Sequence, residues 1–95
     1  MGAPGGVISL ANVFPEITCQ LYDLTVNKQY EEAFKLNERV IQLNKSVSGT
    51  GGVAAVKYAM DLAGLFGGNP RLPLLPLGDD VKKKIEDYLK RENLI

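Results

Sequence analysis

The chain has 95 residues, 45% hydrophobic and 23% charged, and its 11 basic residues balance its 11 acidic ones. This length is about two-thirds of one average domain, so two domains are excluded and we expect a single domain or fragment over 1–95. The composition is that of an ordinary soluble globular chain. A net charge of zero gives no overall field to attract phosphate backbones or anionic lipid, so we expect neither nucleic acid nor membrane as a partner.

Two residue types decide which chemistry is excluded. The sequence has no histidine and one cysteine, Cys19, which excludes an internal disulfide, the usual zinc and copper sites, and histidine-based acid–base catalysis. We therefore predict no metal and no cofactor. Cys19 has no basic neighbour close in the sequence and is interpreted as a packing residue, not a reactive thiol.

The N-terminal residues predict a cytoplasmic protein that begins with a strand. Residues 1–6 carry no basic side chain and the apolar run behind them is short, so we expect neither a signal peptide nor a membrane span. The run itself, GVISLA at 6–11, follows a glycine-rich turn and is typical of a strand buried on both faces of a parallel sheet. The rest of such a sheet is not in this chain.

Helical periodicity dominates the remaining sequence. A proline followed by an acid predicts the start of a helix over 15–26, with Asn12 or Phe14 just before its first turn. Its apolar stripe is Ile17, Leu21 and Leu24. The same period predicts three further helices, over 29–48, 53–66 and 79–92.

Two segments interrupt these helices. The glycine-rich stretch 48–52 is predicted to end the second helix, because each glycine costs about 1 kcal/mol in a helix interior. Residues 71–77 contain two prolines and four leucines, which predicts an extended apolar connection lying against a surface. Arg71 brings five donors to this donor-poor segment, and we expect it to anchor C-terminal carbonyls of the third helix near 66–67.

Three patterns have both a functional and an ordinary interpretation. GTGGVA at 49–54 fits the dinucleotide fingerprint G-x-G-x-x-A, but a helix precedes it where a strand is needed, so nucleotide binding is the minor alternative. The basic cluster around 82–84 is interleaved with acids and is interpreted as a solvated helix face. Lys57 lies among apolar residues and is a candidate Schiff-base lysine, although a lysine that reaches along the surface toward Asp61 is favoured.

Three stretches carry a resemblance to a known family. They are GGVISLANV at 5–13, GVAAVKYAM at 52–60 and GNPRLPLLPL at 68–77. In this order and spacing they resemble the C-terminal part of the dihydrodipicolinate synthase and N-acetylneuraminate lyase family, class I pyruvate-type aldolases on a (β/α)8 barrel followed by extra helices. The stretch 9–12 is one residue shorter than the usual dihydrodipicolinate synthase pattern. It is closer to the 4-hydroxy-2-oxoglutarate and 2-keto-3-deoxygluconate aldolase branches.

The resemblance implies a mainly α fragment of a TIM barrel, with four helices behind strand 8 at 6–11. A full barrel needs about 250 residues, so the family's Schiff-base lysine, tyrosine proton shuttle and carboxylate-binding residues lie upstream, and no catalytic residue is expected in this chain. One position carries over: the backbone carbonyl of Ile8, which in the family lies near the catalytic lysine. Lys57 aligns with a lysine of a C-terminal helix and not with the nucleophile. Asn12 and Arg71 are expected to be structural.

These observations predict the structural and oligomerising C-terminal part of a pyruvate-dependent lyase, without activity of its own. We expect homo-oligomers, because the bare strand 6–11 and the apolar stripe of the first helix both need cover. The missing N-terminal barrel portion is the other expected partner. The alternative is an independent helical module in which 72–77 and the helix stripes bind another protein. Met1 just ahead of strand 8 suggests an expressed fragment or a truncated reading frame.

Overall fold

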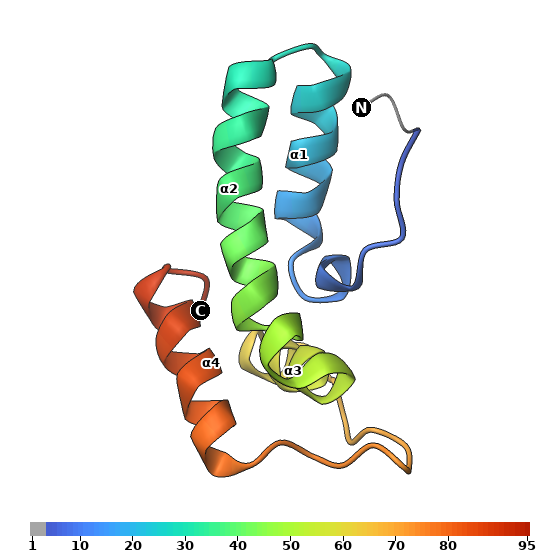
Figure 1. Cartoon of the computed structure of the whole chain (residues 1–95), viewed down its shortest axis with the longest axis vertical. Helices are drawn as coiled ribbons and strands as arrows, with labels where there is room; N and C mark the ends of the chain where they lie inside the picture. Colours follow the sequence, from blue (N-terminus) through green and yellow to red (C-terminus); the bar gives the residue numbers. More distant parts are fainter. Residues whose placement is uncertain (1–3) are drawn as a thin grey trace.

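The computed structural model describes residues 4–95, apart from the side chain of Thr50. The first three residues, part of the stretch in which we expected no targeting signal, lie outside this description. Over the described residues the chain forms helices and no strand. The elements are a 3-10 helix η1 (Ser9–Asn12), then α1 (Pro15–Val26), α2 (Tyr30–Ser46), α3 (Ser48–Leu62) and α4 (Asp79–Arg91). Figure 1 shows α1 and α2 as an antiparallel hairpin, with α3 beneath the end of α2 and α4 packed on α3.

The structure of this chain does not show the strand predicted over 6–11. Residues 5–8 have no regular structure and Ser9–Asn12 form η1. Ile8 keeps strand-like dihedral angles, φ −120° and ψ 115°, but the described chain supplies no neighbouring strand, and a lone strand leaves its donors and acceptors unpaired. The following residues therefore pair locally: the Ala11 N–H donates to the Ile8 carbonyl at 3.1 Å, and the Phe14 N–H to that of Leu10 at 2.9 Å.

The junction between α2 and α3 also differs from the prediction. We expected 48–52 to end the second helix, but α2 ends at Ser46 and Val47 alone separates it from α3. The glycine-rich residues form the first turn of α3, and only Gly52 leaves helical geometry, with φ 60° and ψ −135°. A positive φ is readily available to glycine. The glycines thus place a kink inside α3 where a linker was predicted.

The third helix ends four residues earlier than predicted. It stops at Leu62, because Gly64 takes a left-handed conformation with φ 86°. The N–H of Leu65 then donates to the carbonyl of Met60 at 2.9 Å, the six-residue closure that commonly ends helices at glycine. Such an end turns the chain away from the helix axis, and here it directs 65–78 back toward the start of α4 (Figure 1).

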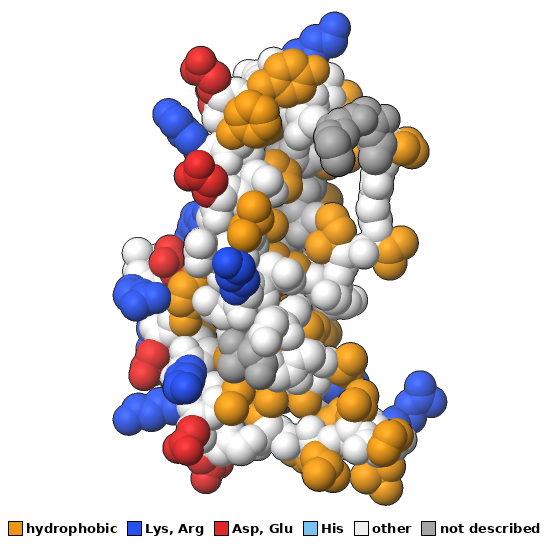
Figure 2. Space-filling model, in the orientation of Figure 1, with side chains coloured by type: hydrophobic (Ala, Val, Ile, Leu, Met, Phe, Trp, Pro, Cys, Tyr) orange, Lys and Arg blue, Asp and Glu red, His pale blue; other side chains and the backbone are white. Residues whose placement is uncertain are grey.

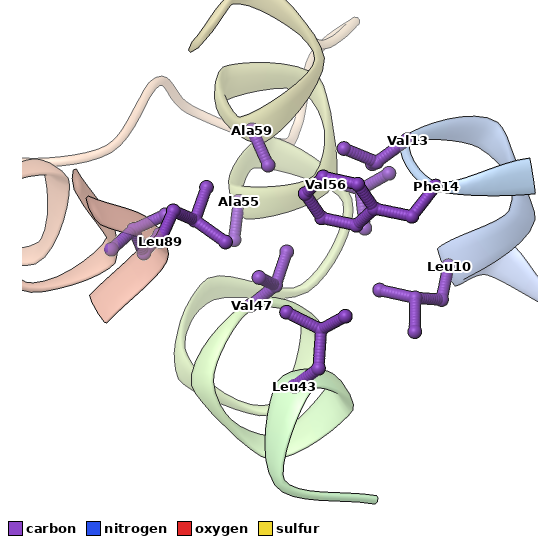
Figure 3. Close-up of a cluster of buried hydrophobic side chains, with 10 residues drawn as sticks. Leu10, Val13, Phe14, Leu43, Val47, Ala55, Val56, Ala59 and Leu89 are labelled. Atoms are coloured by element: carbon purple, nitrogen blue, oxygen red, sulfur yellow. The ribbon is translucent and has the colours of Figure 1, made fainter. Parts of the chain in front are cut away.

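The hydrophobic core lies where η1, the end of α2, α3 and α4 meet. Figure 3 shows side chains from these elements pointing toward one another. The helix α1 contributes no fully buried residue, and its predicted stripe is half-buried where α1 packs on α2. The stripe is therefore not the bare surface that the sequence led us to expect. The buried core residues are Leu10, Val13, Phe14, Leu43, Val47, Ala55, Val56, Ala59, Ile85 and Leu89.

Candidate functional site

Two sequence-selected residues meet at an open depression of about 460 Å³ between η1 and α3. Asn12 reaches it from the end of η1 and Lys57 from the middle of α3, and Ser9 and Ser48 add two hydroxyls. The kink at Gly52 forms part of the wall. The depression therefore gathers polar groups from two separated stretches of the chain, η1 and α3.

Asn12 and Ser48 have different roles at this depression. The Asn12 side-chain amide donates to the Ser9 carbonyl at 3.0 Å, so it closes the single turn of η1. The Ser48 hydroxyl oxygen is buried and has no hydrogen-bond partner among the described residues. Sequence reasoning missed Ser48, because a serine ahead of glycines is typical of a turn and nothing local indicates that its hydroxyl becomes buried.

Lys57 holds the loop that follows α3. Its ammonium donates to the Gly67 carbonyl at 3.1 Å, while the Gly67 N–H donates to the Asp61 carboxylate at 2.8 Å. The backbones approach so closely that a Cβ at Gly67 would overlap the Lys57 carbonyl. Lys57 and Asp61 therefore both bind the backbone of Gly67, and the half-buried lysine is engaged as a hydrogen-bond donor.

Ile8 and Arg71 lie outside this depression. Ile8 lines a separate open depression of about 470 Å³ beside Val40 and Ile41, and its carbonyl accepts the Ala11 N–H. We expected Arg71 to bind carbonyls near 66–67, but Lys57 occupies the Gly67 carbonyl and Arg71 is exposed. Asn12 and Lys57 thus share one depression, whereas Ile8 and Arg71 lie away from it.

The remaining motifs have structural explanations. Gly51 lies under Leu77, whose Cδ2 is 2.5 Å from the position that a Cβ would take, so this glycine allows the loop to pack on α3. On the same helix as the basic cluster at 82–84, Lys90 pairs with Glu86 at 3.0 Å. The hydrogen bond to Glu86 and its charge raise the pKa of Lys90. Cys19, interpreted as a packing residue, is in fact exposed.

Two further findings concern metal ligands and membrane-crossing helices among the described residues. No group of three or more acidic, cysteine or histidine side chains in residues 4–95 is placed to hold a metal ion. None of the helices in that part of the chain has the length and apolar character needed to cross a membrane.

Comparison with known proteins assigns the family. The sequence model of the dihydrodipicolinate synthetase family matches residues 1–92 of this chain. The chain belongs to that family. The protein of Bartonella bacilliformis named 4-hydroxy-tetrahydrodipicolinate synthase is 34% identical over 94 residues, which are 99% of this chain and 32% of the relative. The proteins of the same name from Marinobacter nauticus and Archaeoglobus fulgidus are both 32% identical, over 99% and 100% of this chain and 32% and 33% of their own lengths.

The chain thus spans about a third of the length of these curated relatives. Family membership supports a fragment of a larger protein and does not favour the independent interaction module that we kept as the alternative. The mainly helical fold agrees with such a fragment.

Proposed function

We propose that this chain is the C-terminal structural part of a cytoplasmic, Schiff-base-forming, pyruvate-dependent lyase, and that it carries no catalytic group of its own. The observation that carries the proposal is the family match along nearly the whole chain together with coverage of only a third of each relative. The resemblance implies that the imine-forming lysine belongs to the two-thirds that this chain does not match.

The surroundings of Lys57 support the absence of imine chemistry here. An amine attacks a ketone only when it is deprotonated and placed beside the carbonyl carbon, with an acid–base partner that removes water. The Lys57 ammonium donates to the Gly67 carbonyl, and its neighbour Asp61 accepts the N–H of the same residue. Both groups are thus used to hold a loop.

The proposal also gives Ile8 a role, through its backbone. Strand-like dihedral angles at Ile8 and its exposure suit a residue that joins a sheet when the rest of the barrel is present. In that assembly the Ile8 carbonyl would lie beside the catalytic lysine, as the resemblance implies.

Complementation tests this function. The Bartonella bacilliformis relative is expressed without the segment that matches this chain, and this chain is added as a separate polypeptide. Pyruvate and borohydride then trap any imine. Borohydride donates hydride to the C=N bond and converts the imine to a stable secondary amine. We expect labelling of the truncated relative to rise when this chain is added, and a Val56→Asp core variant to give no rise.

The relative's own segment, added in the same way, is the positive control. If that segment restores labelling and this chain does not, the proposed structural role is wrong.

A further inference from the structure

The segment between α3 and α4, residues 65–78, has no regular secondary structure. Its three prolines lack the N–H that a helix or a ladder needs, so the path of the segment depends on its contacts with the helices. Figure 1 shows it running from the end of α3 to the start of α4, and Figure 2 shows apolar side chains gathered along it. We call residues 65–78 the strap.

One end of the strap is held by two charged side chains. The Lys57 ammonium donates to the Gly67 carbonyl at 3.1 Å, and the Asp61 carboxylate accepts the Gly67 N–H at 2.8 Å. Lys57 and Asp61 lie one helical turn apart on α3, so they share a face of that helix. Hydrogen bonds to charged groups are stronger than those between neutral groups. We call these two hydrogen bonds the latch.

The other end of the strap is held by packing. Leu77 is half-buried and lies over Gly51 in the first turn of α3, where an added Cβ would come within 2.5 Å of the Leu77 Cδ2. The missing side chain of Gly51 thus makes room for the leucine. The strap is fixed near both ends of α3, by the latch at one and by Leu77 at the other.

Between these two points the strap covers a small cavity of about 50 Å³. Polar groups line it from both sides: Tyr58 and Asp61 from α3, Asn69 from the strap and Lys82 from α4. A cavity of this size and polarity has room for at least one water molecule. A space beneath a segment also removes the van der Waals contacts that would hold it. The attachment of the strap is therefore concentrated at its two ends.

Two glycines with positive φ lie on either side of the latch. The φ angle is 86° at Gly64 and 73° at Gly68, in a region that other residues enter only at a cost. Glycine also has the widest choice of alternative backbone angles. Hinges are a few loop residues that absorb large changes of φ and ψ, and Gly64 and Gly68 can do this.

We propose that the strap opens as one unit, turning at Gly64 and Gly68, while the four α-helices stay folded. Opening breaks both hydrogen bonds of the latch together and lifts Leu77 from Gly51, which admits water to the cavity beneath. Segments with few buried contacts open in this way at lower free energy than the core. The inference stands apart from the proposed function, because it rests on contacts within this chain alone.

Amide hydrogen exchange measured by NMR tests the proposal. The Gly67 N–H reports opening of the strap, and the N–H of Ala59, which is fully buried in the core, is the reference. Lys57→Met removes only the bond to the Gly67 carbonyl. Because both bonds break together, the Gly67 amide should exchange at least about tenfold faster, the effect of one hydrogen bond to a charged group. Lys35→Met, at a lysine of α2, is the matched control and should change this exchange by less than about twofold.

Gly51→Ala tests the far end of the strap. The added Cβ displaces Leu77, so the Gly67 amide should exchange about threefold faster or more, although alanine is the better helix former. Helix propensity alone would leave the exchange unchanged or slow it. Unchanged or slower exchange of Gly67 in this variant would show that the two ends do not open together.

Val40→Ala separates opening of the strap from unfolding of the whole chain. Val40 lies on α2 and packs against the core, so this variant should speed exchange at Ala59 and leave Gly67 unchanged within about twofold. Equal acceleration at both amides would mean that Gly67 exchanges only by global unfolding and would overturn the proposal. An unchanged Gly67 amide in Lys57→Met, with helix content confirmed by circular dichroism, would overturn it too.

Discussion

At the residue scale, the backbone of Gly67 lies directly against that of Lys57. A Cβ at position 67 would overlap the Lys57 carbonyl, and a peptide group cannot turn aside as a flexible side chain can. The Gly67 carbonyl accepts a hydrogen bond from the Lys57 ammonium, and the Gly67 N–H donates one to the Asp61 carboxylate. The position thus combines a steric requirement with two hydrogen bonds.

We predict that Gly67→Ala lowers the free energy of unfolding by about 2 kcal/mol, the usual cost of overpacking. Urea denaturation followed by circular dichroism measures it. Gly49→Ala is the control, because a Cβ there meets only the Asn44 carbonyl at 3.7 Å. Gly49 lies in the first turn of α3, so this variant should be neutral or gain up to about 1 kcal/mol. Equal losses in both variants would contradict the close approach.

At the scale of elements, α3 and α4 meet at Tyr58. Burial, followed by the negative charge of Glu86, raises the pKa of the Tyr58 phenol above its ordinary value of 10.0. The Lys82 ammonium lies 5.4 Å from the centre of the ring. The contact between the two helices is therefore sensitive to alkaline pH.

Ionisation of Tyr58 should weaken the fold above about pH 10. The unfolded chain releases its phenolic proton first as pH rises, so the contribution of Tyr58 to stability is present below its unfolded pKa and is lost as pH rises toward the folded one. Tyr58→Phe should make the unfolding free energy fall less steeply between about pH 9 and pH 11. Urea denaturation at several pH values measures this, and identical slopes in the two proteins would contradict it.

Elements defined by local signals could be predicted, and elements defined by neighbours could not. The proline and the apolar period that start α1 act within one or two turns, and the helix spans Pro15–Val26. The strand at 6–11 depends on partner strands, and without them its residues form η1. The kink at Gly52 depends on how α3 packs against the end of α2, which no local pattern reveals.

Less of the candidate site could be predicted, because its contacts depend on elements that are distant in the sequence. Lys57 and Asn12 were selected from their sequence surroundings and line one depression. The partner of Lys57 depends on the path of the loop after α3, which passes Gly67 near the ammonium. No local pattern reveals the partner of Arg71, which is exposed, so its stabilising role stays a prediction.

At the scale of the whole molecule, the core is concentrated at one end of the α1–α2 hairpin. Most buried residues lie around the junction of η1, α2, α3 and α4, whereas the distal part of the hairpin, 22–34, contains Ala33 as its buried residue. Its aromatic residues Tyr22, Tyr30 and Phe34 are exposed. Stability is therefore distributed unevenly along the hairpin.

Hydrogen exchange should reveal this difference. Segments with few buried contacts open at lower free energy than the core, so amides in 22–34 should exchange faster than those of the core segment 53–60. Mass spectrometry of peptides from exchanged protein measures both segments in one sample. Equal protection of the two segments would contradict a core concentrated at the junction.

The central claim is that this chain provides structure to a pyruvate-dependent lyase without forming the imine. Incubation of the chain alone with pyruvate and borohydride, followed by intact-mass measurement, tests it most directly. We predict no covalent adduct, because Lys57 is held by the Gly67 carbonyl and imine formation needs a positioned, deprotonated amine. A stoichiometric adduct that disappears in Lys57→Arg would contradict the claim and make Lys57 the nucleophile.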